Sequence, residues 1–293
     1  MKILIAYDGS DCAEAALADL KRAGLPKNAE ALVISISENW LPTPRSLGGV
    51  DTHYAGEWPG PLEKAELMVT HALEVIRAAF PHWVVTGEAQ PGSPATVVIE
   101  KADAWQPDLI VLGSRGRSGL SRLILGSVST KVLTEARCSV RVARGRVRPA
   151  ETPVRLIIGV DGSLGAEAAV RSVIKRSWPQ GSAACVFAAT FPPPEIIASQ
   201  MPGSLREWVI EERERVRRMV ESSARDLAAA GLVASPLIKE GDPKQLLCDE
   251  AERWGADCIF VGAKNLSRID RFLLGSVSAA VAARAHCSVE VVR

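Results

Sequence analysis

The hydrophobic positions of the chain fall into short apolar runs separated by stretches with helical periodicity. The runs have the length of strands and mostly lack alternation with polar residues; in the first 144 residues they lie at about 2–7, 31–36, 83–88, 108–112 and 138–143. Between them, helices are predicted after Ser10 and at about 62–80, 94–105 and 127–137. Strands that are buried on both faces and separated by helices run parallel, so the pattern predicts a doubly wound α/β sheet of about five strands.

The same pattern occurs twice along the chain. The opening KILIAYDGSDCAEAAL is matched by RLIIGVDGSLGAEAAV, which aligns Asp8 with Asp161. The segment GSRGRSGLSRLILGS at 113–127 is matched by GAKNLSRIDRFLLGS at 262–276, an offset of 149 residues. We therefore predict two domains, residues 1–144 (the first half) and residues 154–293 (the second half), joined by the basic, proline-containing linker RGRVRPAETP.

The second half contains one helical pattern that is longer than its counterpart, at about 205–230. Two oppositely charged pairs lie four positions apart there, Glu211 with Arg215 and Glu214 with Arg218. This spacing is typical of ion pairs on a solvated helix face.

Composition and charge limit the classes of function. The 293 residues carry 35 basic and 34 acidic side chains, a net charge of +1, which gives no electrostatic case for binding nucleic acid. The apolar runs are far shorter than the roughly 20 residues of a membrane span, and the N-terminus lacks the features of a signal peptide, so we expect no membrane association and a cytoplasmic location. The six cysteines form no C-x-x-C pair and are expected to be buried reduced thiols, and the four scattered histidines predict no zinc site.

The chemistry of the chain is concentrated in the glycine-rich loop after the predicted fourth strand. Gly113 and Gly116 permit positive φ and a close backbone approach, and Gly126-Ser127 offers free backbone N–H groups at the start of a helix, where phosphate binds well. Nearby positive charge would come from Arg115, Arg117 and Arg122. Glycines after a strand are also common turn formers and Ser127 could simply cap the helix, so spacing alone leaves both readings open. The chain has neither a Walker P-loop nor a G-x-G-x-x-G fingerprint.

The arrangement Gly113-x2-Gly116-x9-Gly126-Ser127, together with the Asp8-Gly9-Ser10 turn, resembles the nucleotide-binding signature of the universal stress protein family. The resemblance covers nearly the whole chain as two fused copies. It implies a Rossmann-like, five-stranded parallel sheet of order 3-2-1-4-5 in each half, with helices on both faces. It also implies that the halves pair through their last strands as an intrachain pseudo-dimer, and that two such chains could form a homodimer.

The family resemblance further implies ATP as ligand, with Mg²⁺ held through the nucleotide and Asp8. The residues that it assigns to the nucleotide in the first half are Asp8, Ile36, Gly113, Gly116, Arg117, Gly126, Ser127 and Val128. The equivalent set in the second half is Asp161, Ala189, Gly262, Gly275 and Ser276. Asn265 replaces the second glycine there and adds bulk next to the phosphates, although Lys264 could compensate, so we expect binding mainly in the first half. For Asp8, a turn closed by its own side chain is the structural alternative.

Three functions remain open from the sequence. The leading one is an ATP-binding regulatory protein of the stress response with an unknown protein partner. The second is a slow ATPase that acts as a timer, although no catalytic residue is identified and the SGGxDS loop of ATP pyrophosphatases is absent. The third is a nucleotide-independent interaction module that uses the Pro-rich segments 41–61 and 191–203, with Trp40, Trp58, Phe191 and Met201 as a contact surface, although ordinary packing of these side chains against the domain is the structural alternative.

Overall fold

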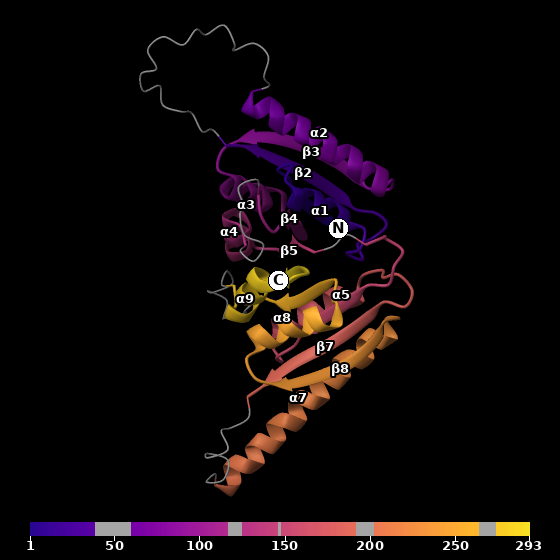
Figure 1. Cartoon of the computed structure of the whole chain (residues 1–293), viewed down its shortest axis with the longest axis vertical. Coiled ribbons are helices and arrows are strands. Elements are labelled where there is room, and N and C mark those ends of the chain that lie inside the picture. The colour runs from indigo at the N-terminus through magenta and orange to yellow at the C-terminus, as the bar shows by residue number, and fades with distance from the viewer. Residues whose placement is uncertain (39–59, 117–124, 146–147, 192–201, 264–273) are drawn as a thin grey trace, which may run out of the picture.

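The chain folds into a single ten-stranded sheet covered by helices on both faces (Figure 1). The structure is a computed structural model and describes residues 1–38, 60–116, 125–145, 148–191, 202–263 and 274–293. The strands of the first half are β1 (Lys2–Ala6), β2 (Glu30–Ser37), β3 (Val84–Pro91), β4 (Leu109–Gly113) and β5 (Ser139–Ala143). Those of the second half are β6 (Arg155–Gly159), β7 (Ala183–Thr190), β8 (Val233–Glu240), β9 (Cys258–Gly262) and β10 (Ser288–Val292).

The helices follow the predicted alternation with the strands. In the first half they are α1 (Asp11–Leu20), α2 (Pro61–Ala79), α3 (Pro94–Trp105) and α4 (Ser127–Glu135). In the second half they are α5 (Leu164–Ile174), α7 (Gly203–Ala229), α8 (Pro243–Trp254) and α9 (Ser276–Arg284). Most bounds agree with the sequence patterns to within two residues; β3 extends three residues past the predicted end because it stays paired with β2 as far as Pro91.

The strand order within each half is the predicted 3-2-1-4-5, with every strand parallel to its neighbours. The second half repeats this order, and the two half-sheets are joined by an antiparallel pairing of β5 with β10. The predicted doubly wound fold is therefore confirmed, and the halves form one continuous sheet through their last strands.

The two faces of the sheet are packed differently. On one face α3, α4, α8 and α9 cover a single apolar core that runs through both halves, with residues such as Ile110 and Ile259 at its centre. On the other face α1 and α2 cover one core and α5 and α7 cover another. Successive residues of a strand point to opposite faces, so β1 sends Leu4 to the shared core, and Ile3 and Ile5 to the separate one.

Helix α7 is the longest element and is only partly packed. Its buried residues Val216, Val220, Ala224 and Leu227 lie toward its C-terminus, and in Figure 1 its N-terminal part extends beyond the sheet. The predicted ion pairs of this helix are wrong by one residue. Arg215 binds Glu212 and Arg217 binds Glu214, each three positions apart, because these side chains project to neighbouring points of the helix surface as readily as those four apart.

The cysteines are all free thiols; Cys185, Cys258 and Cys287 are buried, and the other three are partly exposed. Among the described residues, no helix combines the length and the apolar character needed to cross a membrane.

Candidate functional site

The turn after β1 contains Asp8, and its carboxylate closes that turn. Asp8 Oδ1 accepts hydrogen bonds from the Ser10 backbone N–H at 3.1 Å and from Ser10 Oγ at 2.6 Å. Ser10 Oγ in turn caps α1 by accepting from the N–H of Ala13 at 3.2 Å. The structural alternative for Asp8, an Asx-type turn, is therefore present, and it fixes the carboxylate at the carboxyl end of β1.

The loop after β4 meets this turn, as expected for neighbouring parallel strands. A Cβ added to Gly116 would lie 2.8 Å from Asp8 Oδ2, and Arg115 O lies 3.3 Å from Ser10 Oγ. Asp8 and Gly116, which are 108 positions apart in the sequence, are thus brought into direct proximity at one end of the sheet.

Helix α4 begins at the same place. The N–H of Gly126 donates to Ser114 O at 2.8 Å, which ties the start of the helix to the loop after β4. Gly126 is the N-cap residue, and no side chain of the described residues caps this end, unlike the Ser10 cap of α1. Ser127 is exposed and Val128 packs partly against the core. A Cβ added to Gly126 would lie 3.8 Å from the backbone nitrogen of Gly116, so the start of α4, with its first free N–H groups, lies beside this loop.

The glycines of the signature serve close packing and not the positive φ that the sequence suggested. Gly113, Gly116 and Gly126 are all described, and none of them has a positive φ. A Cβ at Gly113 would lie 2.7 Å from the carbonyl carbon and oxygen of Cys12. The missing side chain therefore lets the end of β4 approach the first turn of α1.

Two serines that sequence reasoning missed hold the site together. Ser114 supplies the carbonyl for Gly126, and Ser129 Oγ donates to Gly113 O at 2.9 Å. The equivalent Ser278 Oγ donates to Gly262 O at 2.7 Å in the second half. The repeated G-S-V-S sequence at 126–129 and 275–278 is the signal that could have indicated this role.

A second unpredicted group lies beside Asp8. The hydroxyl of Tyr7 donates to the Glu14 carboxylate, and His71 Nε2 lies 3.0 Å from Glu14 Oε1. Burial, together with the hydrogen bond to Glu14, raises the pKa of Tyr7 well above its usual range and keeps the phenol neutral. These residues come from β1's end, α1 and α2, so no local sequence pattern links them.

Positive charge gathers at the end of β4 and β5. Burial lowers the pKa of Arg144, and the positive charge of Arg115 lowers it further. Arg144 is partly buried and donates to Ala283 O at 3.2 Å.

The remaining predicted residues of the first half are less closely gathered. Ile36 lies near the end of β2, half-buried against the core under α3 and α4. Several predicted contributors lie outside the described residues: Arg117, Arg122, Lys264 and Asn265, as well as Trp40, Trp58 and Met201 of the Pro-rich segments. Within the described part of the chain, no cluster of three or more His, Cys, Asp or Glu side chains could hold a metal ion.

The second half has a cavity at the equivalent end of its sheet. It has a volume of about 250 Å³, and Asp161 and Ala189 both line it. Trp208, Arg215 and Met219 of α7 form its other wall. Ser163 N donates to Asp161 Oδ1 at 3.0 Å, which repeats the turn of Asp8, and Gly275 and Ser276 begin α9 as Gly126 and Ser127 begin α4.

Comparison with known proteins gives a consistent match. The family model described as "Universal stress protein family" matches residues 1–144 and 154–293. A universal stress protein of Thermus aquaticus is 34% identical over 48% of this chain and 97% of its own length, and YxiE of Bacillus subtilis is 32% identical over 49% of this chain and 98% of its own. The crystal structure of a universal stress protein from Archaeoglobus fulgidus is similar over 100% of this chain and 96% of that one, with a TM-score of 0.65 and 21% identity.

Proposed function

The chain belongs to the universal stress protein family, and from this premise we propose that its first half binds an adenine nucleotide, with ATP as the expected ligand. In this proposal the nucleotide is the signal of a stress-response regulator, and its occupancy alters contacts with a protein partner. The site residues are those named from the sequence, Asp8, Ile36, Gly113, Gly116, Arg117, Gly126, Ser127 and Val128.

The observation that carries the proposal is the meeting of three elements at one end of the sheet. The turn at Asp8, the loop at Gly116 and the start of α4 at Gly126 come together where the strand order reverses, with β2 on one side of β1 and β4 on the other. Doubly wound sheets bind their ligands at this position. The first N–H groups of α4 and the positive charge of Arg115, in the loop after β4, suit phosphates.

Magnesium fits this site as an ion carried by the nucleotide. Mg²⁺ is commonly held by one or two carboxylates together with phosphate oxygens and water. Asp8 supplies one such carboxylate, with Oδ2 directed at Gly116 and therefore at the proposed phosphate position. Bound Mg²⁺ would neutralise phosphate charge, while Ser10 keeps the orientation of the Asp8 side chain fixed.

We propose that the second half binds nucleotide more weakly than the first. Asn265 stands where Gly116 stands in the first half, and a side chain there would compete with the ligand for space. The cavity at Asp161 and Ala189 leaves room for an adenine-sized group. Arg215, which lines this cavity, is tied to Glu212 at 2.6 Å and would have to exchange that partner to hold a phosphate.

A nucleotide-independent interaction module is the second candidate function. The exposed apolar side chains at the N-terminal part of α7 favour it, since Trp208 is 58% and Ile210 is 61% exposed. Absence of ATP binding by the folded chain would support this candidate over the first.

Calorimetric titration of the purified chain with ATP and Mg²⁺ tests the proposal. We expect one tight site, weakened by more than about tenfold in Asp8→Asn, because Asn preserves the turn but removes the charge. Asp161→Asn is the matched control in the second half and should leave that site unchanged. Phosphate release measured in the same samples separates binding from slow hydrolysis. Equal losses of ATP affinity in the two variants would contradict the proposal. So would the absence of ATP binding by the folded wild-type chain as well as by the variants.

A further inference from the structure

The antiparallel pairing of β5 with β10 has a local two-fold axis. Equivalent positions in the two halves differ by 149, so residues 289–291 correspond to residues 140–142. The three paired positions are Val289 with Val142, Glu290 with Arg141 and Val291 with Val140. The pairs on either side of Arg141 and Glu290 are therefore equivalent to each other, and the axis passes between Arg141 and Glu290. At this one place each half meets its own equivalent residue.

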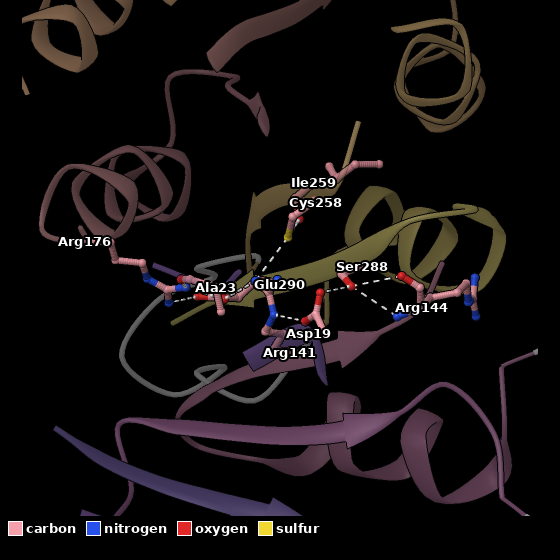
Figure 2. A network of polar contacts seen from close by, with 9 residues as sticks. All are labelled: Asp19, Ala23, Arg141, Arg144, Arg176, Cys258, Ile259, Ser288 and Glu290. Atoms are coloured by element: carbon pink, nitrogen blue, oxygen red, sulfur yellow. Dashed lines mark hydrogen bonds and ion pairs between the residues drawn. The ribbon is translucent and has the colours of Figure 1, made fainter. Parts of the chain in front are cut away.

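The residues at the axis differ in charge, and both are buried. Arg141 is 1% and Glu290 is 0% exposed, and Arg141 Nη1 lies 3.2 Å from Glu290 Oε2. Each belongs to a second ion pair within its own half, Arg141 Nε with Asp19 Oδ2 at 2.6 Å and Glu290 with Arg176. The four charges form an alternating row across the boundary (Figure 2).

Two further contacts tie this row to the opposite half. Arg176 Nη1 donates to Ala23 O at 2.8 Å, and Ser288 Oγ donates to Asp19 Oδ1 at 2.9 Å (Figure 2). Their counterparts in the repeat are not the same residue types: Ala23 corresponds to Arg176, and Asp19 corresponds to Ser172. The polar contacts around the axis therefore fit a pairing of two different halves.

Other contacts across the boundary are alike in both halves. Arg144 of the first half donates to Ala283 O at the end of α9, and its equivalent Arg293 donates to Cys138 O just after α4. Ser288 Oγ accepts from Arg144 N, and its equivalent Ser139 Oγ accepts from Arg293 N. A pairing of two identical halves would keep such contacts, so they do not select the partner.

We propose that the Arg141–Glu290 pair makes the pairing of the halves selective, so that the β5 edge accepts a β10 edge and rejects a second β5. Two first halves joined in this register would place Arg141 against Arg141, and two second halves would place Glu290 against Glu290. Each charge would keep the ion pair of its own half, but it would lose its partner across the axis and face a buried like charge there, which is strongly disfavoured. The row of four charges would be broken at its centre in either case.

Selective pairing determines how copies of this chain associate. Two chains cannot join through their first halves at β5, so the β5 edge is reserved for a β10 edge, in the same chain or in a partner that exchanges halves. Any association of closed chains must use another surface.

The test uses the whole chain with a protease recognition sequence inserted between Ala150 and Glu151. The folded protein is cut there, unfolded in denaturant and refolded as a mixture of both halves, and native mass spectrometry measures the pairs. Random pairing would give equal numbers of mixed pairs and pairs of identical halves, and we expect the mixed pairs to outnumber the identical ones by more than about tenfold. Arg141→Lys should keep this preference, whereas Glu290→Arg, which places arginine on both sides of the axis, should abolish it. Pairs of identical halves at random proportion, or a Glu290→Arg chain that pairs like Arg141→Lys, would overturn the proposal.

The uncut chain provides a second measurement that needs no refolding. Glu290→Arg is expected to open the boundary and to raise amide hydrogen exchange at 139–143 by at least about tenfold, and Glu290→Gln by less. Unchanged exchange in Glu290→Arg would overturn the proposal even if the refolded halves gave no pairs.

Discussion

Gly113 and Gly116 belong to the same loop, but they lack a side chain for different reasons. The position of a Cβ at Gly113 is occupied by the backbone of Cys12, whereas the position of a Cβ at Gly116 is near the movable carboxylate of Asp8. We predict that Gly113→Ala lowers the free energy of unfolding by about 1–3 kcal/mol, as overpacking does. Gly116→Ala should cost little stability and instead weaken ATP binding.

Urea denaturation of both variants, followed by titration with ATP, measures these two effects separately. Gly262→Ala makes the same change at the equivalent position of the second half, where a Cβ would lie 2.2 Å from the backbone of Gly165. It is therefore the matched control for the packing effect of Gly113→Ala. A Gly113→Ala chain as stable as the wild type would refute the packing role.

Three thiols, those of the buried Cys185 and Cys287 and of the partly exposed Cys138, give the stability of the chain a specific pH dependence. Burial raises the pKa of Cys138 and of Cys185 from 9.0 to about 11, and that of Cys287 to about 12. The folded chain thus favours the protonated thiols. Their contribution is complete below about pH 9, the pKa in the unfolded chain, and is lost as the pH rises toward the folded values.

We therefore predict that the free energy of unfolding falls by on the order of 1 kcal/mol for each of these three thiols between about pH 9 and pH 10. Denaturation curves at several pH values, compared with those of a variant carrying alanine at the three positions, measure this loss. Lysines and tyrosines titrate in both proteins and affect both alike. Free energies of unfolding that fall in parallel with pH in the two proteins would therefore contradict the prediction.

At the level of single residues, the sequence predicted the carboxyl-end position of Asp8 and Gly116 because both directly follow strands. It did not predict the Tyr7, Glu14 and His71 contact, which depends on how α1 and α2 pack. Periodicity defines which face of a helix is apolar, but it does not define which polar side chains of two helices meet.

At the scale of elements, the position of α4 against β4 is fixed by Ser129 and its bond to Gly113 O. Ser129→Ala removes a buried hydrogen bond and should lower the free energy of unfolding by about 1 kcal/mol. Because the first turn of α4 is then less firmly placed, we predict a loss of ATP affinity of up to about fivefold.

Ser278→Ala is the matched variant in α9, where the same bond is made to Gly262 O. It should cost similar stability but leave ATP affinity unchanged, as measured by denaturation and by calorimetry. Equal effects of the two variants on ATP affinity would contradict the assignment of the nucleotide to the first half.

The sequence predicted the order and type of the elements because the apolar runs are long and the turns are well marked. It gave the wrong ion pairs in α7, since Arg215 and Arg217 bind partners three positions away. Sequence spacing identifies helix neighbours three and four apart, and only side-chain conformation selects between them.

At the scale of the whole molecule, Arg22 connects the linker to both halves. Arg22 lies on the chain segment after α1, is 5% exposed, and donates to Pro149 O at 2.8 Å and to Thr152 O at 3.0 Å. It also lies 3.2 Å from Asp257 of the second half. We predict that Arg22→Met lowers the free energy of unfolding by about 3 kcal/mol, as the loss of one partner of a buried ion pair does.

Thermal denaturation of the variant measures this prediction. Arg148→Gln is the control, because Arg148 is 46% exposed and its contact with Asp257 is 3.7 Å, so it should cost less than about 1 kcal/mol. Equal costs for the two variants would refute the role of Arg22.

The joining of the two half-sheets was predicted only through the family resemblance, because no pattern within either half defines a partner for β5. The charges at Arg141 and Glu290 could be read from the sequence as an unusual difference between aligned strands. Their meaning required the register, which places them opposite each other.

The central claim, that nucleotide binds at the start of α4, is tested most directly by the backbone amide resonances of the ¹⁵N-labelled chain during titration with ATP and Mg²⁺. The amides of Gly126, Ser127 and Val128 should shift at the lowest ATP concentrations, and those of Gly275 and Ser276 only at higher concentrations. Shifts confined to α9, or no shifts at the start of α4 in an ATP-saturated sample, would contradict the account.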